Sequence, residues 1–159
     1  MHEIIILIAK YFIILSALGF LYVLYKIPRN EKFNFILVAA LGGIFSLVLA
    51  KLASHFILDP RPFVQGHFSP LISHAADNGF PSDHTLLAAF LAFVTFTKSR
   101  KIGGILLLIA LLIGLARMAA GIHHSWDILG SFVITFLAYQ AVSRAIVYVR
   151  KRSAPAPTR

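Results

Sequence analysis

Two kinds of residue are scarce in this sequence: cysteine and charged residues. Its 159 residues include no cysteine, and Asp, Glu, Lys and Arg together make up only 13% of the chain. The absence of thiols excludes disulfides, zinc–thiolate sites and cysteine nucleophiles, and it leaves the redox compartment open. Because soluble globular domains contain about 25% charged residues, the low charged fraction argues against a soluble domain.

Hydrophobic residues are correspondingly abundant. They make up 58% of the chain, against about 45–50% in soluble domains, and the mean hydropathy is +0.82. We therefore expect an integral membrane protein, and the length suits a single transmembrane domain over residues 1–152. Residues 153–159 contain two prolines and no apolar face, which predicts a disordered tail.

The excess of basic over acidic residues has one meaning in a soluble protein and another in a membrane protein. A formal charge of +9 would suggest nucleic-acid binding by a soluble domain. Here the Lys and Arg residues flank apolar segments, as they do on the cytoplasmic side of membrane proteins. We expect the lipid bilayer as a partner and no nucleic acid, and the sequence leaves the oligomeric state open.

Five apolar segments qualify, or nearly qualify, as membrane spans, which need about 20 mostly apolar residues. The expected fold class is therefore all-α, a polytopic bundle of about five transmembrane helices. The third segment is short. The first lacks the basic flank and cleavage site of a signal peptide and is interpreted as a retained span. The predicted spans are residues 4–25, 33–58, 82–97, 102–120 and 126–149.

The distribution of Lys and Arg predicts the orientation of these spans in the cell membrane. With five spans, the first connection, the third connection and the C-terminal flank lie on the same side, and they hold most of the basic residues. By the positive-inside rule this side is cytoplasmic. The C-terminus is then cytoplasmic, and the remaining connections are extracytoplasmic.

Three clusters of polar residues fall on the predicted outer side, each near the end of a span. The first cluster lies on both sides of the end of the second span. The second cluster is at the start of the third span, and the third cluster lies between the fourth and fifth spans. We therefore expect an active site at the outer membrane interface. The clusters contain Lys51, Asp59 and Arg61; Pro81, Ser82, Asp83 and His84; and Arg117, His123 and Asp127.

The clusters combine groups that bind phosphate with groups that transfer protons. Arginine offers planar donors suited to phosphate oxygens, and a helix that starts after Ser82 would point its first N–H groups at an anion. His123 and Asp127 are four residues apart, so on one helical turn they share a face. The carboxylate can then fix the tautomer of His123 and leave its other ring nitrogen free to attack phosphorus, while His84 protonates the leaving oxygen.

Taken together, these motifs resemble those of the type 2 phosphatidic acid phosphatase superfamily. Arg117-x5-His123-x3-Asp127 is similar to the third signature of that family, Pro81-Ser82-Asp83-His84 to the second, and Arg61-Pro62 to the first. The resemblance implies that His123 is a nucleophile forming a phosphohistidine, with Asp127 as its partner and His84 as the general acid. It also implies a phosphate clamp and a metal-independent reaction without a cofactor. The clamp residues would be Arg61, Arg117, Ser82, Asp83 and Lys51.

The sequence departs from the family pattern in three places. Asp83 stands where the family usually has glycine, which resembles the bacterial undecaprenyl-diphosphate phosphatase branch. Nine residues separate Lys51 from Arg61, three more than the family spacing, so whether Lys51 reaches the phosphate stays open. Family members usually have six spans, and we count five.

The resemblance implies a lipid phosphatase that hydrolyses undecaprenyl diphosphate to the monophosphate in cell-wall carrier recycling. A phosphatidate or phosphatidylglycerophosphate phosphatase is the alternative, and a transporter or a lipid-phosphate binder is a further one. His124 competes with His123 for the role of nucleophile, although the spacing to Arg117 and Asp127 favours His123. We expect no metal. His123, His124 and Asp127 could supply ligands, but no second carboxylate or histidine lies at ligand spacing nearby. His67 and His74 are assigned to the surface or to a lid.

Overall fold

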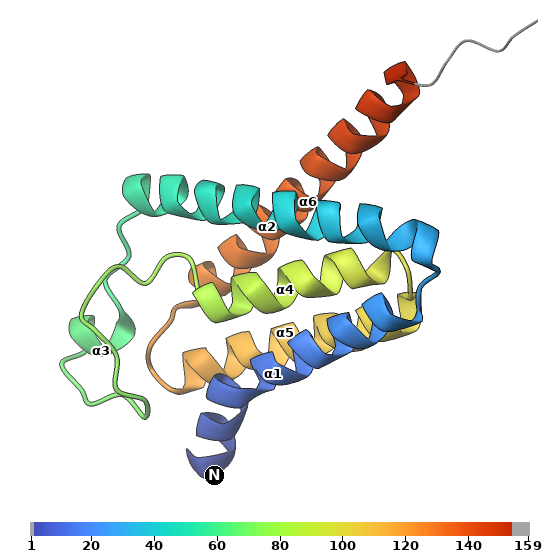
Figure 1. Ribbon diagram of the computed structural model, residues 1–159. Coiled ribbons are helices and arrows are strands. Elements are labelled where there is room, and N and C mark those ends of the chain that lie inside the picture. Colours follow the sequence, from blue (N-terminus) through green and yellow to red (C-terminus); the bar gives the residue numbers. More distant parts are fainter. Residues whose placement is uncertain (1, 154–159) are drawn as a thin grey trace, which may run out of the picture.

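A computed structural model of the protein describes residues 2–153 (Figure 1). The helices follow one another as α1 (His2–Lys26), α2 (Arg29–Phe56), α3 (Pro62–Gln65), α4 (Asp83–Phe96), α5 (Arg100–Ala119) and α6 (Ser125–Ser153). Every regular element within these residues is a helix, which confirms the predicted all-α fold. Of the predicted disordered tail, Ser153 is the last residue of α6, and residues 154–159 lie outside the described residues.

Four of the helices are long and apolar enough to cross a membrane, namely α1, α2, α5 and α6. These match four of the five predicted spans. The third predicted span is α4, whose 14 residues rise only about 21 Å at 1.5 Å per residue, against about 30 Å for the hydrocarbon core of a bilayer. The short four-residue helix α3 was not predicted.

Helix α4 lies at the centre of the bundle, between α1, α2, α5 and α6 (Figure 1). Its buried residues include larger side chains such as Phe90 together with three alanines, Ala88, Ala89 and Ala92, which are fully buried. Because lipid tails are as apolar as the helices, helices in a membrane associate through close packing rather than through a hydrophobic driving force. The alanines of α4 allow its four neighbours to approach closely.

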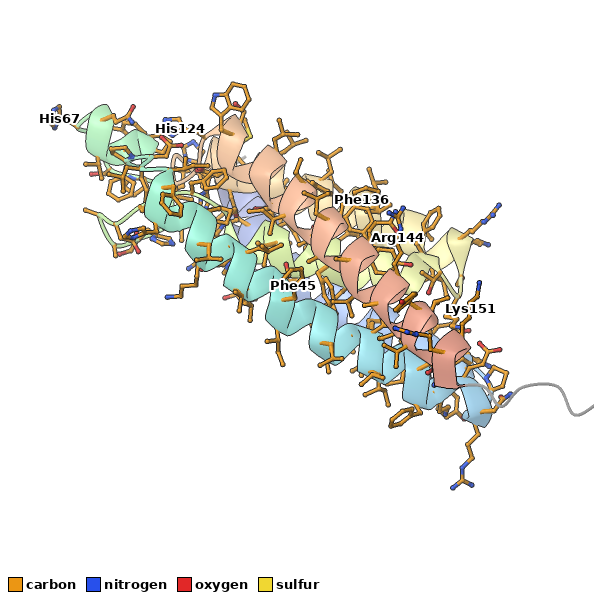
Figure 2. The ribbon with its side chains drawn as sticks, turned by 90° about the horizontal axis from the view of Figure 1, so that it is seen from above. Phe45, His67, His124, Phe136, Arg144 and Lys151 are labelled. Atoms are coloured by element: carbon orange, nitrogen blue, oxygen red, sulfur yellow. The ribbon has the colours of Figure 1, made fainter. Side chains whose placement is uncertain are left out.

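The two ends of the bundle differ in character. The long connection between α2 and α4, which contains α3, lies at the end where α4 and α6 begin (Figure 1). Figure 2 shows His67 and His124 at this end and Lys151 at the other. At the other end, Lys98 in the turn after α4 forms an ion pair with Glu31 at 2.7 Å. This ion pair connects that turn to the start of α2.

The connection between α2 and α4 is tied to the end of α2 by Asn78. Its amide nitrogen donates to the carbonyl oxygens of Ser54 and Ile57 at 2.9 and 2.8 Å, and its oxygen accepts from the N–H of Asp59 at 2.8 Å. The last carbonyls of a helix have no partner within the helix. Asn78 therefore completes α2 and at the same time fixes the residues that lead into α4.

Candidate active site

A cavity of about 490 Å³ opens between the C-terminal end of α2, the connection to α4, the start of α4 and the end of α5. The predicted site residues meet here although they come from separate segments of the chain. Six of the eight line the cavity: Lys51, Arg61, Asp83, His84, Arg117 and His123. The other two, Asp127 and Ser82, are fully buried beside it.

His123 is held from one side by Asp127. Its Nδ1 lies 3.0 Å from the Oδ2 of Asp127, and the same oxygen accepts the backbone N–H of His124 at 2.9 Å. Because a carboxylate accepts, Nδ1 carries the proton and Nε2 keeps its lone pair. His123 precedes α6, which begins at Ser125, so the predicted pair forms between a loop and the first turn of a helix, not along one helical turn.

Two arginines face the free nitrogen of His123. Nη1 of Arg61 and Nη2 of Arg117 each lie 3.4 Å from Nε2, and both residues are buried. Arg61 donates to the carbonyl of Ile122 at 2.9 Å. Burial lowers the pKa of His123, and the two arginines lower it further against the opposing hydrogen bond of Asp127. His123 is therefore held as a neutral imidazole whose free nitrogen lies between two fixed cations.

The predicted Pro-Ser-Asp-His motif forms the start of α4. Ser82 is the residue before the helix, as expected, but its hydroxyl makes no capping hydrogen bond and instead accepts from Thr85 at 3.2 Å. Asp83 and His84 are the first two residues of α4, and both line the cavity. His84 thus faces the same space as His123, as an acid opposite a nucleophile requires.

Sequence reasoning missed the contribution of the long connection. His74, assigned to the surface or a lid, lines the cavity, and the centre of its ring lies 6.3 Å from that of His123. Asp77 accepts from Nε of Arg61 at 2.8 Å. Burial raises the pKa of Asp77, but the hydrogen bond and the charge of Arg61, with smaller contributions from a backbone hydrogen bond and His74, together lower it. Neither residue belongs to a recognisable motif, so only the folded loop could have revealed them.

A second histidine–aspartate pair lies behind the first. Nδ1 of His124 is 3.1 Å from the carboxylate of Asp59, and ligand atoms of Asp59, His124 and Asp127 all lie within 4.8 Å of one another. The expectation that no second carboxylate lies near His123, His124 and Asp127 was therefore wrong, because Asp59 is close to both His124 and Asp127. Burial and the neighbouring Asp127 raise the pKa of Asp59 against the opposing effect of His124.

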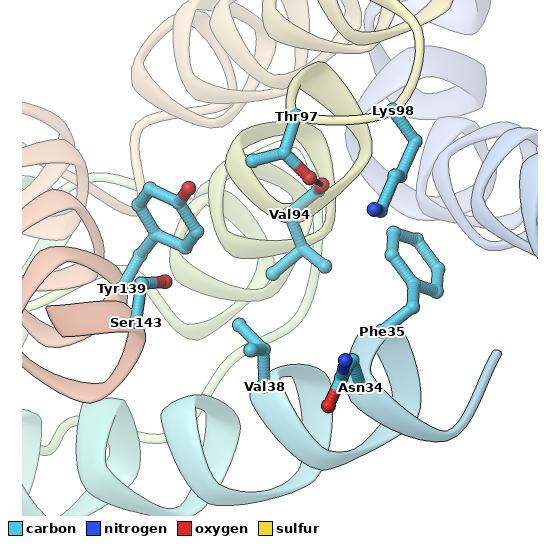
Figure 3. Close-up of a pocket in the computed structure, with 8 residues that line it drawn as sticks. All are labelled: Asn34, Phe35, Val38, Val94, Thr97, Lys98, Tyr139 and Ser143. Atoms are coloured by element: carbon cyan, nitrogen blue, oxygen red, sulfur yellow. Dashed lines mark hydrogen bonds between the residues drawn. The ribbon is translucent and has the colours of Figure 1, made fainter. Parts of the chain in front are cut away.

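A smaller cavity of about 140 Å³ lies at the opposite end of the bundle, between α2, α6 and the end of α4 (Figure 3). Its side chains include Phe35, Val38 and Tyr139, and none of the predicted site residues lines it. The one charged residue in its wall, Lys98, is already paired with Glu31. This cavity lacks the convergent cations of the cavity that contains His123.

Comparison with known proteins agrees with this geometry. The chain is 35% identical over 137 residues to a Bacillus subtilis (strain 168) protein named undecaprenyl-diphosphatase BcrC, and the match covers 86% of this chain and 70% of that protein. The fold is similar to the crystal structure of Aquifex aeolicus LpxE, with a TM-score of 0.66 and 23% identity over 89% of this chain and 93% of that one.

A second solved structure, titled the first transmembrane PAP2 type phosphatidylglycerolphosphate phosphatase from Bacillus subtilis, has a TM-score of 0.64 and 21% identity. That match covers 93% of this chain and 77% of the other. The model of the PAP2 superfamily matches residues 31–151, which include all three polar clusters. This chain therefore belongs to the PAP2 superfamily and is a membrane lipid phosphatase of that family.

Proposed function

We propose that the protein hydrolyses undecaprenyl diphosphate to the monophosphate at the outer face of the cell membrane, through a phosphohistidine and without a metal ion. The observation that carries this proposal is the position of His123 Nε2, which faces two buried guanidinium groups at 3.4 Å each. The choice of substrate is supported by the name of the relative that is 35% identical. This reaction would return the lipid carrier of cell-wall synthesis to use.

In the first step, the terminal phosphate lies between Arg61 and Arg117, whose donors match its oxygens. Nε2 of His123 attacks phosphorus in line with the bond to the leaving oxygen. The P–O bond breaks, its electron pair goes to the leaving oxygen, and His84 can supply a proton to that oxygen. Asp127 stabilises the positive charge that develops on the His123 ring.

In the second step, water attacks the phosphorus of the phosphohistidine. The P–N bond breaks, its electron pair returns to Nε2, and inorganic phosphate leaves the cavity. The two arginines neutralise the phosphoryl charge in both steps, which is the task that metal ions perform in other phosphoryl-transfer enzymes. This division of roles is the basis for proposing a metal-independent reaction.

The polar clusters also bear on the alternative of a transporter. A transporter needs polar groups near the bilayer midplane, whereas the cavity with its cations lies at one end of the bundle, where α4 begins and α5 ends. The phosphatase is therefore the function that the geometry supports best. Phosphatidate and phosphatidylglycerophosphate remain the competing substrates, and they are compared directly in the test.

The test is phosphate release by the detergent-purified protein in the presence of EDTA. It would be offered undecaprenyl diphosphate, phosphatidate and phosphatidylglycerophosphate side by side. We expect the fastest release from the diphosphate, no loss with EDTA, and an acid-labile phosphoenzyme that is absent in His123→Asn. The matched control is His67→Asn on the exposed loop.

Other outcomes would contradict separate parts of the proposal. A preference for a glycerolipid would overturn the substrate. Activity that EDTA removes and a divalent cation restores would place a metal at Asp59, His124 and Asp127. A His123→Asn variant that retains turnover would refute the nucleophile.

A further inference from the structure

The wall of the cavity that α2 provides is a single helical face. Leu47, Ala50, Lys51 and Ser54 all line the cavity, and these positions are three, four and seven residues apart, as expected of side chains on one side of a helix. Lys51 lies five residues before the last residue of α2, about 8 Å along the helix axis at 1.5 Å per residue. The α2 wall of the cavity therefore reaches about 8 Å inward from the end of the helix, and Arg61 lies beyond that end.

The cations of the cavity have different surroundings. Arg61 and Arg117 are buried, contact His123, and bind the fixed oxygens of Ile122 and Ala9 respectively. Lys51 is exposed, and no ion pair or hydrogen bond of its ammonium group is found among residues 2–153. The two arginines are thus placed to bind the phosphoryl group that His123 attacks. Lys51 is a separate cation in the wall of the same cavity.

From this arrangement we propose that Lys51 binds the leaving phosphate of a lipid diphosphate, the phosphate that stays with the lipid. This inference rests on the proposed function. The tail of such a substrate lies in the bilayer, so its lipid-bound phosphate is the one nearer the middle of the bundle and its terminal phosphate is the outer one. The order of the two phosphates then matches the order of Lys51, which lies within α2, and Arg61, which lies beyond the end of that helix.

The chemistry of the leaving group gives Lys51 and His84 separate tasks. When the substrate is a monophosphate ester, the P–O bond breaks to give an alkoxide, which needs a proton from His84. When the substrate is a diphosphate, the electron pair goes to an oxygen of the lipid phosphate, which is a stable anion and needs a nearby cation. Lys51 supplies that cation. The lysine therefore favours anhydrides over esters at a site whose nucleophile serves both.

The experiment compares a short polyprenyl diphosphate with the monophosphate of the same polyprenol, so that only the second phosphate differs. In Lys51→Met, we expect the ratio of kcat/KM for diphosphate over monophosphate to fall about 10- to 100-fold, the range for losing a hydrogen bond between charged groups. Lys51→Arg should restore the ratio to within about threefold of the unmodified protein. His84→Gln should change the ratio in the opposite direction. Lys10→Met, which removes an exposed lysine of α1, is the matched control.

Two results would overturn the inference while leaving the proposed function intact. An equal loss on both substrates in Lys51→Met would place Lys51 at the transferred phosphate, and an unchanged ratio would show that it contacts neither. If the unmodified protein, folded by its elution and melting behaviour, hydrolysed neither substrate, the proposed function would fail and this inference with it.

Discussion

At the scale of single residues, the site depends on keeping His123 neutral. Its pKa lies below the ordinary histidine value of 6.5, because burial and the two facing arginines disfavour a third cation more than the hydrogen bond of Asp127 favours it. In the proposed mechanism Nε2 attacks only when its lone pair is free, so the neutral ring is the active form. Protonation becomes favourable only when the pH falls through this lowered pKa.

This charge state predicts the acid side of the pH profile. The kcat/KM of the phosphatase should remain high at pH 6.5 and decline only at lower pH, as His123 gains a proton. The measurement is kcat/KM from pH 4 to 8, on a lipid diphosphate and on a monophosphate. The phosphates of the two substrates titrate at different pH values. If the fall in kcat/KM has the same midpoint pH for both substrates, the group that titrates belongs to the enzyme. A limb centred above 6.5 on both substrates would contradict a lowered pKa.

At the scale of elements, the connection between α2 and α4 organises the site. It supplies Arg61, its partner Asp77, and His74, and it is tied to α2 through Asn78. Gly79, next in the chain, lies so close to Asp127 that a Cβ there would be 3.0 Å from Oδ2. The loop therefore packs directly against the carboxylate that is hydrogen-bonded to His123.

The role of this anchor can be tested with Asn78→Ala. The variant loses the hydrogen bonds to Ser54, Ile57 and Asp59, and at about 0.5–1.5 kcal/mol each we expect it to be destabilised by about 2 kcal/mol. Displacement of Asp77 and Arg61 should lower kcat/KM about 10- to 100-fold, since small errors in position are costly for catalysis. Thermal unfolding in detergent and phosphate release measure the two effects.

Gln65→Ala is the matched control for that variant. Gln65 lies in the same connection, and its single side-chain hydrogen bond, to the carbonyl of Pro60 at 2.8 Å, is exposed. We expect a change in stability within about 0.5 kcal/mol, as for other surface substitutions, and unchanged activity. If Asn78→Ala behaved like Gln65→Ala, the loop would be held by its packing and not by this side chain.

The connection between α2 and α4 contains the site residues whose contacts could not be predicted from the sequence. Long apolar runs fixed the helices to within a few residues, because span length and hydropathy are local properties. The motif residues were placed at one end because the spans alternate in direction. The contacts of His74, Asp59 and Asp77 could not be predicted, since a 26-residue connection has no periodicity. These residues contact His123, His124 and Arg61, which lie 16 or more positions away in the chain.

At the scale of the whole molecule, the cavity and the basic turns lie at opposite ends. The turns at Lys98 and Lys26 are rich in basic residues, whereas the cavity opens where α2 ends and α4 begins. In a cell membrane, the basic end is expected in the cytoplasm. The phosphatase site would then face outward and meet lipid phosphates in the outer leaflet.

The absence of cysteine makes this orientation directly measurable, because any introduced cysteine is unique in the chain. Ser69→Cys lies on the exposed connection near the cavity, and Lys101→Cys lies on the exposed start of α5 at the other end. With a maleimide that cannot cross membranes, we expect intact cells to label Ser69→Cys and to label Lys101→Cys only after permeabilisation. The reverse pattern would place the site in the cytoplasm and contradict the expected orientation. Labelling of both cysteines in intact cells would mean that the two loops share one side, which five membrane crossings do not allow.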